Sequence, residues 1–141
     1  MSYVVDTSVF LRWWVEQVGF QHARRVREQF VAGAIVLATP DFTRIEHAEV
    51  LRRKGLLEGV MSLEEYLVAV ASLDVLGVEM VSLDRDELER AAGLAATRSL
   101  RMFDAIGASL ALSRGLPLLT GDARSARALA GVVDVEVLEG I

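Results

Sequence analysis

The 141-residue chain is 52% hydrophobic and 25% charged, which fits a single domain with one buried core and argues against disorder. It contains no cysteine, so disulfides, thiolate metal sites and cysteine nucleophiles are excluded; it also has no apolar run long enough to span a membrane and no secretion signal, so we expect a soluble, cytoplasmic protein. The net charge of -5 argues against a general nucleic-acid coat protein, but it allows an enzyme whose acids surround a metal ion.

A short apolar segment opens the chain and ends in an acid. Residues 3–5 predict a buried strand, and Asp6 follows it directly. Ligands of open parallel sheets bind beyond the carboxyl ends of the strands, so Asp6 is a candidate site residue. The alternative is that Asp6 caps the helix that follows, because Asp is a favoured N-cap residue. Helices are expected over 9–18 and 22–32, and a second apolar strand over 34–38.

The next predicted helix carries an acid on an apolar face. Thr39-Pro40 is typical of an N-cap followed by the first helical residue, and Gly55 fits the position just past the end, so a helix is expected between them. On this helix one row, with a spacing of four residues, contains Phe42, Glu46 and Val50. Glu46 has no local basic partner, so it is a candidate site residue. The alternative is a glutamate at the helix edge that reaches water.

Two neighbours of Glu46 have simpler interpretations. Glu49 lies four residues before Arg53, a spacing that predicts a surface ion pair. His47 lies off the apolar row, so we expect it to be exposed.

The middle of the chain shows two helix starts. Ser62-x-x-Glu is a capping box that predicts a helix through Leu76, and residues 78–83 then predict a strand or an extended link. Asp84 begins a similar motif before a helix over 85–98. Asp84 therefore has a structural role and is not a candidate site residue.

A nearly apolar helix is expected over 101–112, which places it centrally in the fold. One face of this helix carries a single acid and three small residues: Asp104, Gly107, Ala108 and Ala111. Asp104 is a candidate site residue because the small residues allow close packing around it. The alternative is an ordinary acid in the first turn, where the helix dipole favours negative charge.

The last part of the chain repeats the pattern of a strand followed by an acid. Residues 116–120 predict a strand, and Asp122 lies just past it, either at a site or as the N-cap of a helix over 123–130. Residues 132–138 predict a final strand. The alternation of strands and helices predicts one α/β domain over residues 1–141, an α/β/α sandwich with a mostly parallel central sheet flanked by helices.

Taken together, the four candidate acids indicate a metal site. Asp6 and Asp122 follow strands, whereas Glu46 and Asp104 interrupt apolar helix faces. Carboxylate oxygens are the ligands that Mg²⁺ and Mn²⁺ prefer. Such ions activate water and stabilise displacement at phosphorus, so the expected reaction class is phosphodiester hydrolysis.

The chain resembles PIN-domain ribonucleases, specifically the VapC toxins of VapBC toxin–antitoxin pairs, over essentially its whole length. The matching segments are Val4–Ser8, Pro40 through Glu46 to Arg53, Phe103–Ala105 with Leu110-Ala111, and Leu118–Asp122. The resemblance implies that the four acids form the active site and bind Mg²⁺ or Mn²⁺, supported by the hydroxyls of Thr7, Ser8 and Thr120. It also implies endoribonuclease activity on RNA, a homodimer and a cognate VapB-like antitoxin that blocks the site. Family members often carry Asn where this chain has Glu49, whose role stays open.

Two further expectations concern binding surfaces. Four arginines flank the acids in the sequence and are expected to contact RNA phosphates: Arg98, Arg101, Arg124 and Arg127. The helix with Trp13 and Trp14 is expected to contribute to a dimer or antitoxin interface, because Trp is favoured at interface centres.

Rival functions are weaker. A phosphoaspartyl phosphatase requires Asp-x-Asp-x-Thr after the first strand, and this chain has Ser8 at the second acidic position. The glycine-rich motif of dinucleotide-binding domains is missing from the same place. The remaining alternative is a catalytically idle PIN domain that binds RNA or protein, which would show no site-dependent uptake of Mn²⁺.

Overall fold

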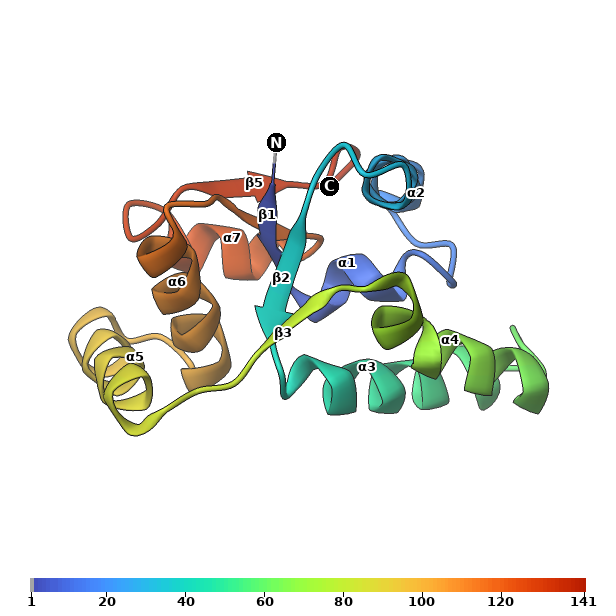
Figure 1. The fold of residues 1–141 in the computed structure, drawn as a ribbon, viewed down its shortest axis with the longest axis horizontal. Helices are drawn as coiled ribbons and strands as arrows, with labels where there is room; N and C mark the ends of the chain where they lie inside the picture. Colours follow the sequence, from blue (N-terminus) through green and yellow to red (C-terminus); the bar gives the residue numbers. More distant parts are fainter. Residues whose placement is uncertain (1) are drawn as a thin grey trace.

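A computed structural model describes residues 2–141, and a parallel sheet forms the centre of this part of the chain (Figure 1). Its five strands are ordered β3-β2-β1-β4-β5, and every neighbouring pair is parallel. The strands are β1 (Tyr3–Val5), β2 (Leu37–Pro40), β3 (Glu79–Val81), β4 (Leu118–Thr120) and β5 (Val135–Val137). The three inner strands are fully buried, as expected for parallel strands that helices cover on both faces.

Helices cover both faces of the sheet, with α1 to α4 on one side and α5 to α7 on the other (Figure 1). They are α1 (Thr7–Leu11), α2 (Phe20–Val31), α3 (Thr43–Leu51), α4 (Leu63–Leu76), α5 (Arg85–Arg98), α6 (Met102–Arg114) and α7 (Ala123–Leu129), with a π-helical turn, η1 (Arg52–Leu56), after α3. The predicted α/β/α sandwich is therefore confirmed. None of the helices in residues 2–141 is both long and apolar enough to cross a membrane.

The central strand shows how the two cores are divided. Successive side chains of a strand point to opposite faces of the sheet. Tyr3 and Val5 thus pack in a core with residues of α1, α2 and α4, whereas Val4 packs in a second core with residues of α6 and α7. Burial on both faces explains why β1 is an uninterrupted apolar run.

Several predicted helix ends are confirmed. The hydroxyl of Ser62 accepts the backbone N–H of Glu65, and the carboxylate of Glu65 accepts the backbone N–H of Ser62, so the capping box is complete. Asp84 accepts the backbone N–H of Glu87 at 2.8 Å and caps α5. The structural role predicted for Asp84 is therefore confirmed.

The prediction for residues 39–55 is wrong at both ends. Thr39 and Pro40 extend β2 and pair with Met80 and Val81 of β3, so α3 begins only at Thr43. At the other end the helix continues through Gly55 as a π-helical turn. Gly55 packs closely against Met61, since a Cβ atom there would lie 2.7 Å from the Cε atom of that side chain.

The helix predicted over 9–18 is also shorter than expected. It ends at Leu11, and Trp13 is only 1% exposed, packed edge-on against Phe10 with 5.0 Å between ring centroids. Trp13 is thus a core residue that is not available to a partner, and the interface expected for this segment stays a prediction for Trp14. Trp14 is half-buried against two core clusters, so part of it remains accessible.

His47 was expected at the surface, but it is fully buried. Its Nε2 atom lies 3.1 Å from the carbonyl oxygen of Ala69 and donates to it, and its ring packs against Phe10. Burial lowers the pKa of His47 from 6.5 to about 4. The burial of His47 depends on α4, and the sequence pattern of α3 alone does not indicate that α4 covers this side of it.

The buried His47 predicts a specific loss of stability in acid. In the unfolded chain the residue binds a proton near pH 6.5, whereas in the fold it stays neutral to about pH 4, so the free energy of unfolding falls as the pH drops through this window. The loss is about 1.4 kcal/mol per pH unit. Urea unfolding of the parent and of His47→Gln at pH 7.5, 6 and 5 measures it. His22→Gln is the control. Equal pH dependence in the parent and in His47→Gln would contradict the prediction.

Candidate active site

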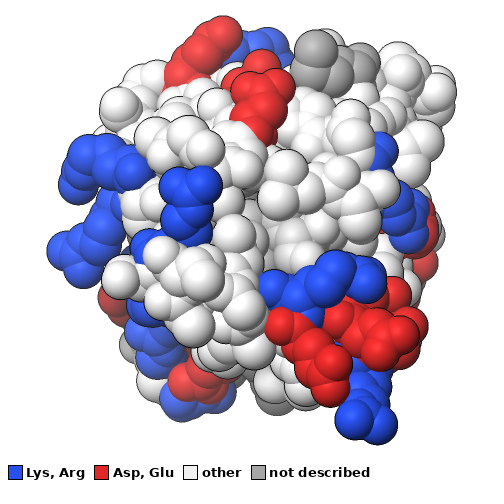
Figure 2. All heavy atoms as spheres, turned by 90° about the vertical axis from the view of Figure 1, so that its left-hand side faces the viewer, with Lys and Arg blue, Asp and Glu red and all other residues white. Residues whose placement is uncertain are grey.

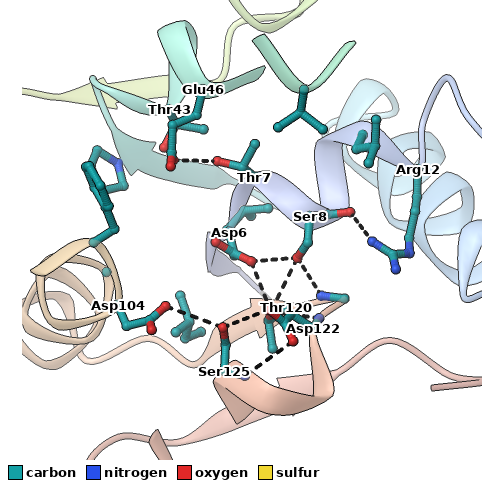
Figure 3. Close-up of a pocket in the computed structure, with 18 of the residues that line it drawn as sticks. Asp6, Thr7, Ser8, Arg12, Thr43, Glu46, Asp104, Thr120, Asp122 and Ser125 are labelled. Atoms are coloured by element: carbon teal, nitrogen blue, oxygen red, sulfur yellow. Dashed lines mark hydrogen bonds between the residues drawn. The ribbon is translucent and has the colours of Figure 1, made fainter. Parts of the chain in front are cut away.

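The four candidate acids line one cavity of about 490 Å³ at the carboxyl ends of the inner strands (Figure 3). Asp6 follows β1, Glu46 lies on α3, Asp104 on α6 and Asp122 just after β4. The structure therefore brings together side chains that are far apart in the sequence, up to 116 positions for Asp6 and Asp122. The hydroxyl residues Thr7, Ser8 and Thr120 line the same cavity.

Hydroxyl groups hold the carboxylate of Asp6. Its Oδ2 atom accepts a hydrogen bond from Ser8 Oγ at 2.6 Å and from Thr120 Oγ1 at 3.1 Å. Ser8 Oγ in turn accepts the backbone N–H of Gly121 at 2.8 Å. Asp6 occupies the N-cap position of α1, but its side chain makes no capping hydrogen bond. Asp6 thus lies at the N-cap position, as the alternative supposes, but its carboxylate is held mainly by hydroxyl groups.

Burial makes ionisation of Asp6 unfavourable. It raises the pKa of this carboxyl above its usual value, and the nearby charge of Asp104 acts in the same direction. The bonds from Ser8 and Thr120 oppose the shift without cancelling it. The site therefore contains a carboxylate whose negative charge is only partly compensated by the protein.

Glu46, in the first turn of α3, has a similar environment. Thr7 Oγ1 donates to its Oε1 atom at 2.8 Å. Burial raises the pKa of Glu46, and the charges of Asp6 and Asp104 add to the shift. Glu46 is half-buried, and its carboxylate turns into the cavity (Figure 3).

Asp122 combines both of its predicted roles. Its Oδ1 atom accepts the backbone N–H groups of Arg124 and Ser125 at 2.9 and 3.4 Å, so it caps α7 while lining the cavity. Although burial acts in the opposite direction, these hydrogen bonds lower the pKa of Asp122 below its usual value. Asp104 is held less tightly, by Arg101 Nε at 3.1 Å and Ser125 Oγ at 3.4 Å.

The cations around the cavity differ from those expected. Four of them line it: Arg12, Arg53, Lys54 and Arg101. Only Arg101 belongs to the predicted set, and Arg98, Arg124 and Arg127 lie outside the residues that line the cavity. Their predicted contact with RNA is not tested by this geometry and stays a prediction.

Arg12 was not identified from the sequence, although it lies one helical turn after Ser8. Its Nη1 atom donates to the carbonyl oxygen of Ser8 and its Nε atom to that of Val18, each at 2.7 Å. Burial lowers the pKa of Arg12, while Asp122 and Asp6 act in the opposite direction. The guanidinium is thus fixed beside the acids by two backbone carbonyls.

Glu49 lies on the surface and outside the cavity lining. It forms ion pairs with Arg52 at 2.7 Å and, as predicted, with Arg53 at 3.5 Å. This carboxylate is therefore neutralised by neighbours on its own helix and its π-helical extension.

The donor set of the cavity fits a hard divalent cation, because its acidic ligands are all carboxylates and several hydroxyls adjoin them. Within residues 2–141, however, no three acid or histidine side chains lie close enough together to ligate one ion directly. Mg²⁺ usually retains several water ligands and binds only one or two carboxylates. The spacing therefore suits an ion that the acids hold partly through water.

Residues 3–131 match the family described as PIN domain. The chain belongs to the PIN-domain family. Among solved structures this PIN domain is similar to PAE2754 from Pyrobaculum aerophilum (22% identity, 96% of this chain and 90% of that one, TM-score 0.62). It is also similar to VapC20 of Mycobacterium tuberculosis, described as a sarcin–ricin loop cleaving toxin (18%, 96% and 99%, TM-score 0.70), and to VapBC-5 of the same organism (24%, 97% and 97%, TM-score 0.57). The curated proteins contain no match. These likenesses establish the fold.

The position of Arg12 in this PIN domain depends on Gly121. A Cβ atom at residue 121 would lie 2.7 Å from Arg12 Nη1 and 3.1 Å from Leu138 Cδ1. Gly121→Ala should therefore displace the guanidinium and lower the free energy of unfolding by about 1–3 kcal/mol. Gly107→Ala is the matched control, because its nearest neighbour is 3.7 Å away.

Urea unfolding of Gly121→Ala alone and combined with Arg12→Ala identifies the cause. If the clash is with the guanidinium, the alanine should cost less in the Arg12→Ala background. An unchanged cost would place the strain at Leu138 instead.

Proposed function

We propose that this protein is a metal-dependent endoribonuclease of the VapC type, a toxin that a cognate VapB-like antitoxin neutralises. The observation that carries the proposal is the convergence of Asp6, Glu46, Asp104 and Asp122 on one cavity at the carboxyl edge of the sheet. Two similar structures support it by their descriptions, one as a cleaving toxin and one as a member of the VapBC toxin–antitoxin family. The proposal includes a single PIN domain over residues 1–141, a homodimer and a cytoplasmic location.

The proposed cofactor is Mg²⁺ or Mn²⁺, which the four acids would hold partly through water ligands. When bound, such an ion lowers the pKa of a ligated water and offsets negative charge on a phosphodiester. The protein contributes the orientation of its ligands. Ser8 and Thr120 fix the carboxylate of Asp6, and Thr7 fixes that of Glu46. The raised pKa values of Asp6 and Glu46 show that the protein alone compensates their charges incompletely.

Recognition of RNA requires cations, because acids dominate the overall charge of -5. Arg12, Arg53, Lys54 and Arg101 line the cavity, and we propose that they contact phosphates on either side of the bond that is cut. Further bases lie on α5, α6 and α7. Figure 2 shows that many basic side chains gather along one side of the face these helices form, away from a mixed cluster of acids and bases. Arg98 at the end of α5 and Arg124 and Arg127 on α7 are proposed to extend phosphate binding beyond the cavity.

The proposal predicts cleavage of single-stranded or looped RNA with Mg²⁺ or Mn²⁺ and none in EDTA. Asp6→Asn, Glu46→Gln, Asp104→Asn and Asp122→Asn should each reduce kcat/KM by at least about a hundredfold, because each removes a ligand for the ion. Glu64→Gln is the control, since this exposed acid on α4 lies outside the cavity lining.

Full activity of Asp6→Asn in a metal-dependent assay would refute this assignment of the site. A parent protein that neither cleaves RNA nor takes up Mn²⁺ in a titration would instead support an idle PIN domain that acts as a binding module.

The uncompensated charge of Asp6 predicts a stability order that reverses with metal. In EDTA, Asp6→Asn should melt at a higher temperature than the parent, because the variant removes a desolvated charge while its amide oxygen still accepts the bonds from Ser8 and Thr120. In excess Mn²⁺ the parent should melt higher, since an ion at a hundred times its Kd stabilises the fold by about 2.7 kcal/mol.

Thermal melts in both buffers measure the order, and Glu64→Gln should shift the melting temperature equally in each. A lower melting temperature of Asp6→Asn by the same margin in EDTA and Mn²⁺ would make Asp6 a purely structural residue.

A further inference from the structure

Two phenylalanines form an aromatic contact at the rim of the acidic cavity. Phe42 and Phe103 both line the cavity, and their ring centroids lie 4.9 Å apart with an angle of 56° between the ring planes. Phe42 immediately precedes α3, which carries Glu46 one turn later, and Phe103 precedes Asp104 in the first turn of α6. The pair therefore bridges two helix N-termini that each supply an acid to the site.

The aromatic pair is not part of a core. Phe103 is 59% exposed, whereas the apolar residues on the sheet side of α6, such as Ala108 and Ala111, are at most 1% exposed. Neither ring belongs to the hydrophobic clusters that buried residues form in the described part of the chain. When a flat apolar surface covers an exposed aromatic ring, apolar area is removed from water and the contact is stabilising.

The chemistry around the rings selects the occupant. Arg53, Lys54 and Arg101 line the same cavity as the two rings, so the cavity combines cations for a phosphate backbone with rings that can hold a base. Proteins that bind single-stranded nucleic acids combine these two features, because every base has a π-face and every linking group has a negative charge. A protein partner would use the rings without any need for the adjoining cations and acids.

We propose that Phe42 and Phe103 form a base-stacking subsite, in which the exposed ring of Phe103 stacks on a nucleobase of single-stranded RNA beside the acidic site. Phe103 is 59% exposed and contacts Phe42 at a tilt, so a base can lie on the exposed part of its ring while Phe42 holds that ring in place. The subsite distinguishes unpaired from paired RNA, because only an unstacked base can reach the ring. The inference rests on the proposed function in that RNA is the ligand.

Binding of two oligomers tests the subsite. One is a fluorescent single-stranded RNA of mixed sequence, and the other is a chain of the same length without bases. Affinities are measured for the full chain in Ca²⁺, which carboxylates also bind, with the RNA checked to remain intact. The parent should prefer the RNA by on the order of tenfold, the contribution of one stacked base.

Variants of Phe103 distinguish stacking on the ring from the effects of apolar volume and of phosphate binding. Phe103→Ala and Phe103→Leu should both lose the preference, because leucine keeps apolar volume but has no ring face, whereas Phe103→Trp should keep it. The dependence of affinity on salt should stay unchanged in all three, since phosphate contacts are retained. Leu112→Ala is the matched control, because Leu112 is also exposed on α6 but lies outside the cavity.

Other results would overturn the subsite. An unchanged preference in Phe103→Ala and Phe103→Leu, or an equal loss of affinity for both oligomers, would exclude stacking. An unchanged preference together with a new oligomeric state in sedimentation would assign the rings to a protein contact. Failure of the proposed function is seen separately. If the parent cleaves no RNA with Mn²⁺ but prefers RNA over the base-free chain, and Phe103→Ala removes that preference, then the subsite exists without the nuclease activity.

Discussion

The central constraint in this structure is the buried negative charge at the end of β1. Asp6 directly follows β1, which lies between β2 and β4, so it is placed at the carboxyl ends of the inner strands, where burial raises the pKa of its carboxyl. The hydroxyls of Ser8 and Thr120 and the backbone of Gly121 form a continuous hydrogen-bonded network with it, which links the end of β1 to the end of β4. This network lets a desolvated acid exist in the fold, and it also fixes how the carboxylate faces the cavity.

The other acids share a second form of compensation. Asp6 and Asp122 occupy N-cap positions, and Glu46 and Asp104 lie in the first turns of α3 and α6, so all four acids are at helix N-termini. In parallel α/β units the strand ends and the helix starts meet at one edge of the sheet, where the helix dipoles favour negative charge. Accumulation of acids there costs less than it would elsewhere on the surface. The pKa values of Asp6 and Glu46 are nevertheless raised, so the dipoles and hydroxyls do not compensate them completely.

The rim of the cavity adds features that the acids alone do not provide. Arg12 is tied to two backbone carbonyls and packs beside Gly121, where a side chain would collide with it. The Phe42–Phe103 pair connects the start of α3 to the start of α6. One cavity therefore contains four acids, a fixed cation and an aromatic contact, a combination that suits a polyanion with flat bases.

The sequence by itself determined the architecture and the four acids, because these depend on local signals. Alternating apolar segments with turn and cap residues predicted the parallel sheet and the order of its helices. Acids that follow strands or interrupt apolar helix faces can be recognised in the sequence, because the spacing of the apolar residues around them shows which neighbours are buried. The capping roles of Ser62, Asp84 and Asp122 were also predictable, because a cap and its partner are at most three residues apart.

Only the tertiary structure decided the features that depend on contacts between distant segments. His47 is buried because α4 covers it, and Trp13 is buried because α2 and the sheet surround it, although neither local pattern shows the covering element. Pro40 belongs to a strand because β3 pairs with it, despite a local sequence that is typical of a helix start. Arg12 lies beside the acids because Gly121 leaves room for its guanidinium. Phe42 contacts Phe103, which is 61 positions further along the chain. The physical reason is the same in each case: burial and approach are set by packing between elements, which local periodicity does not encode.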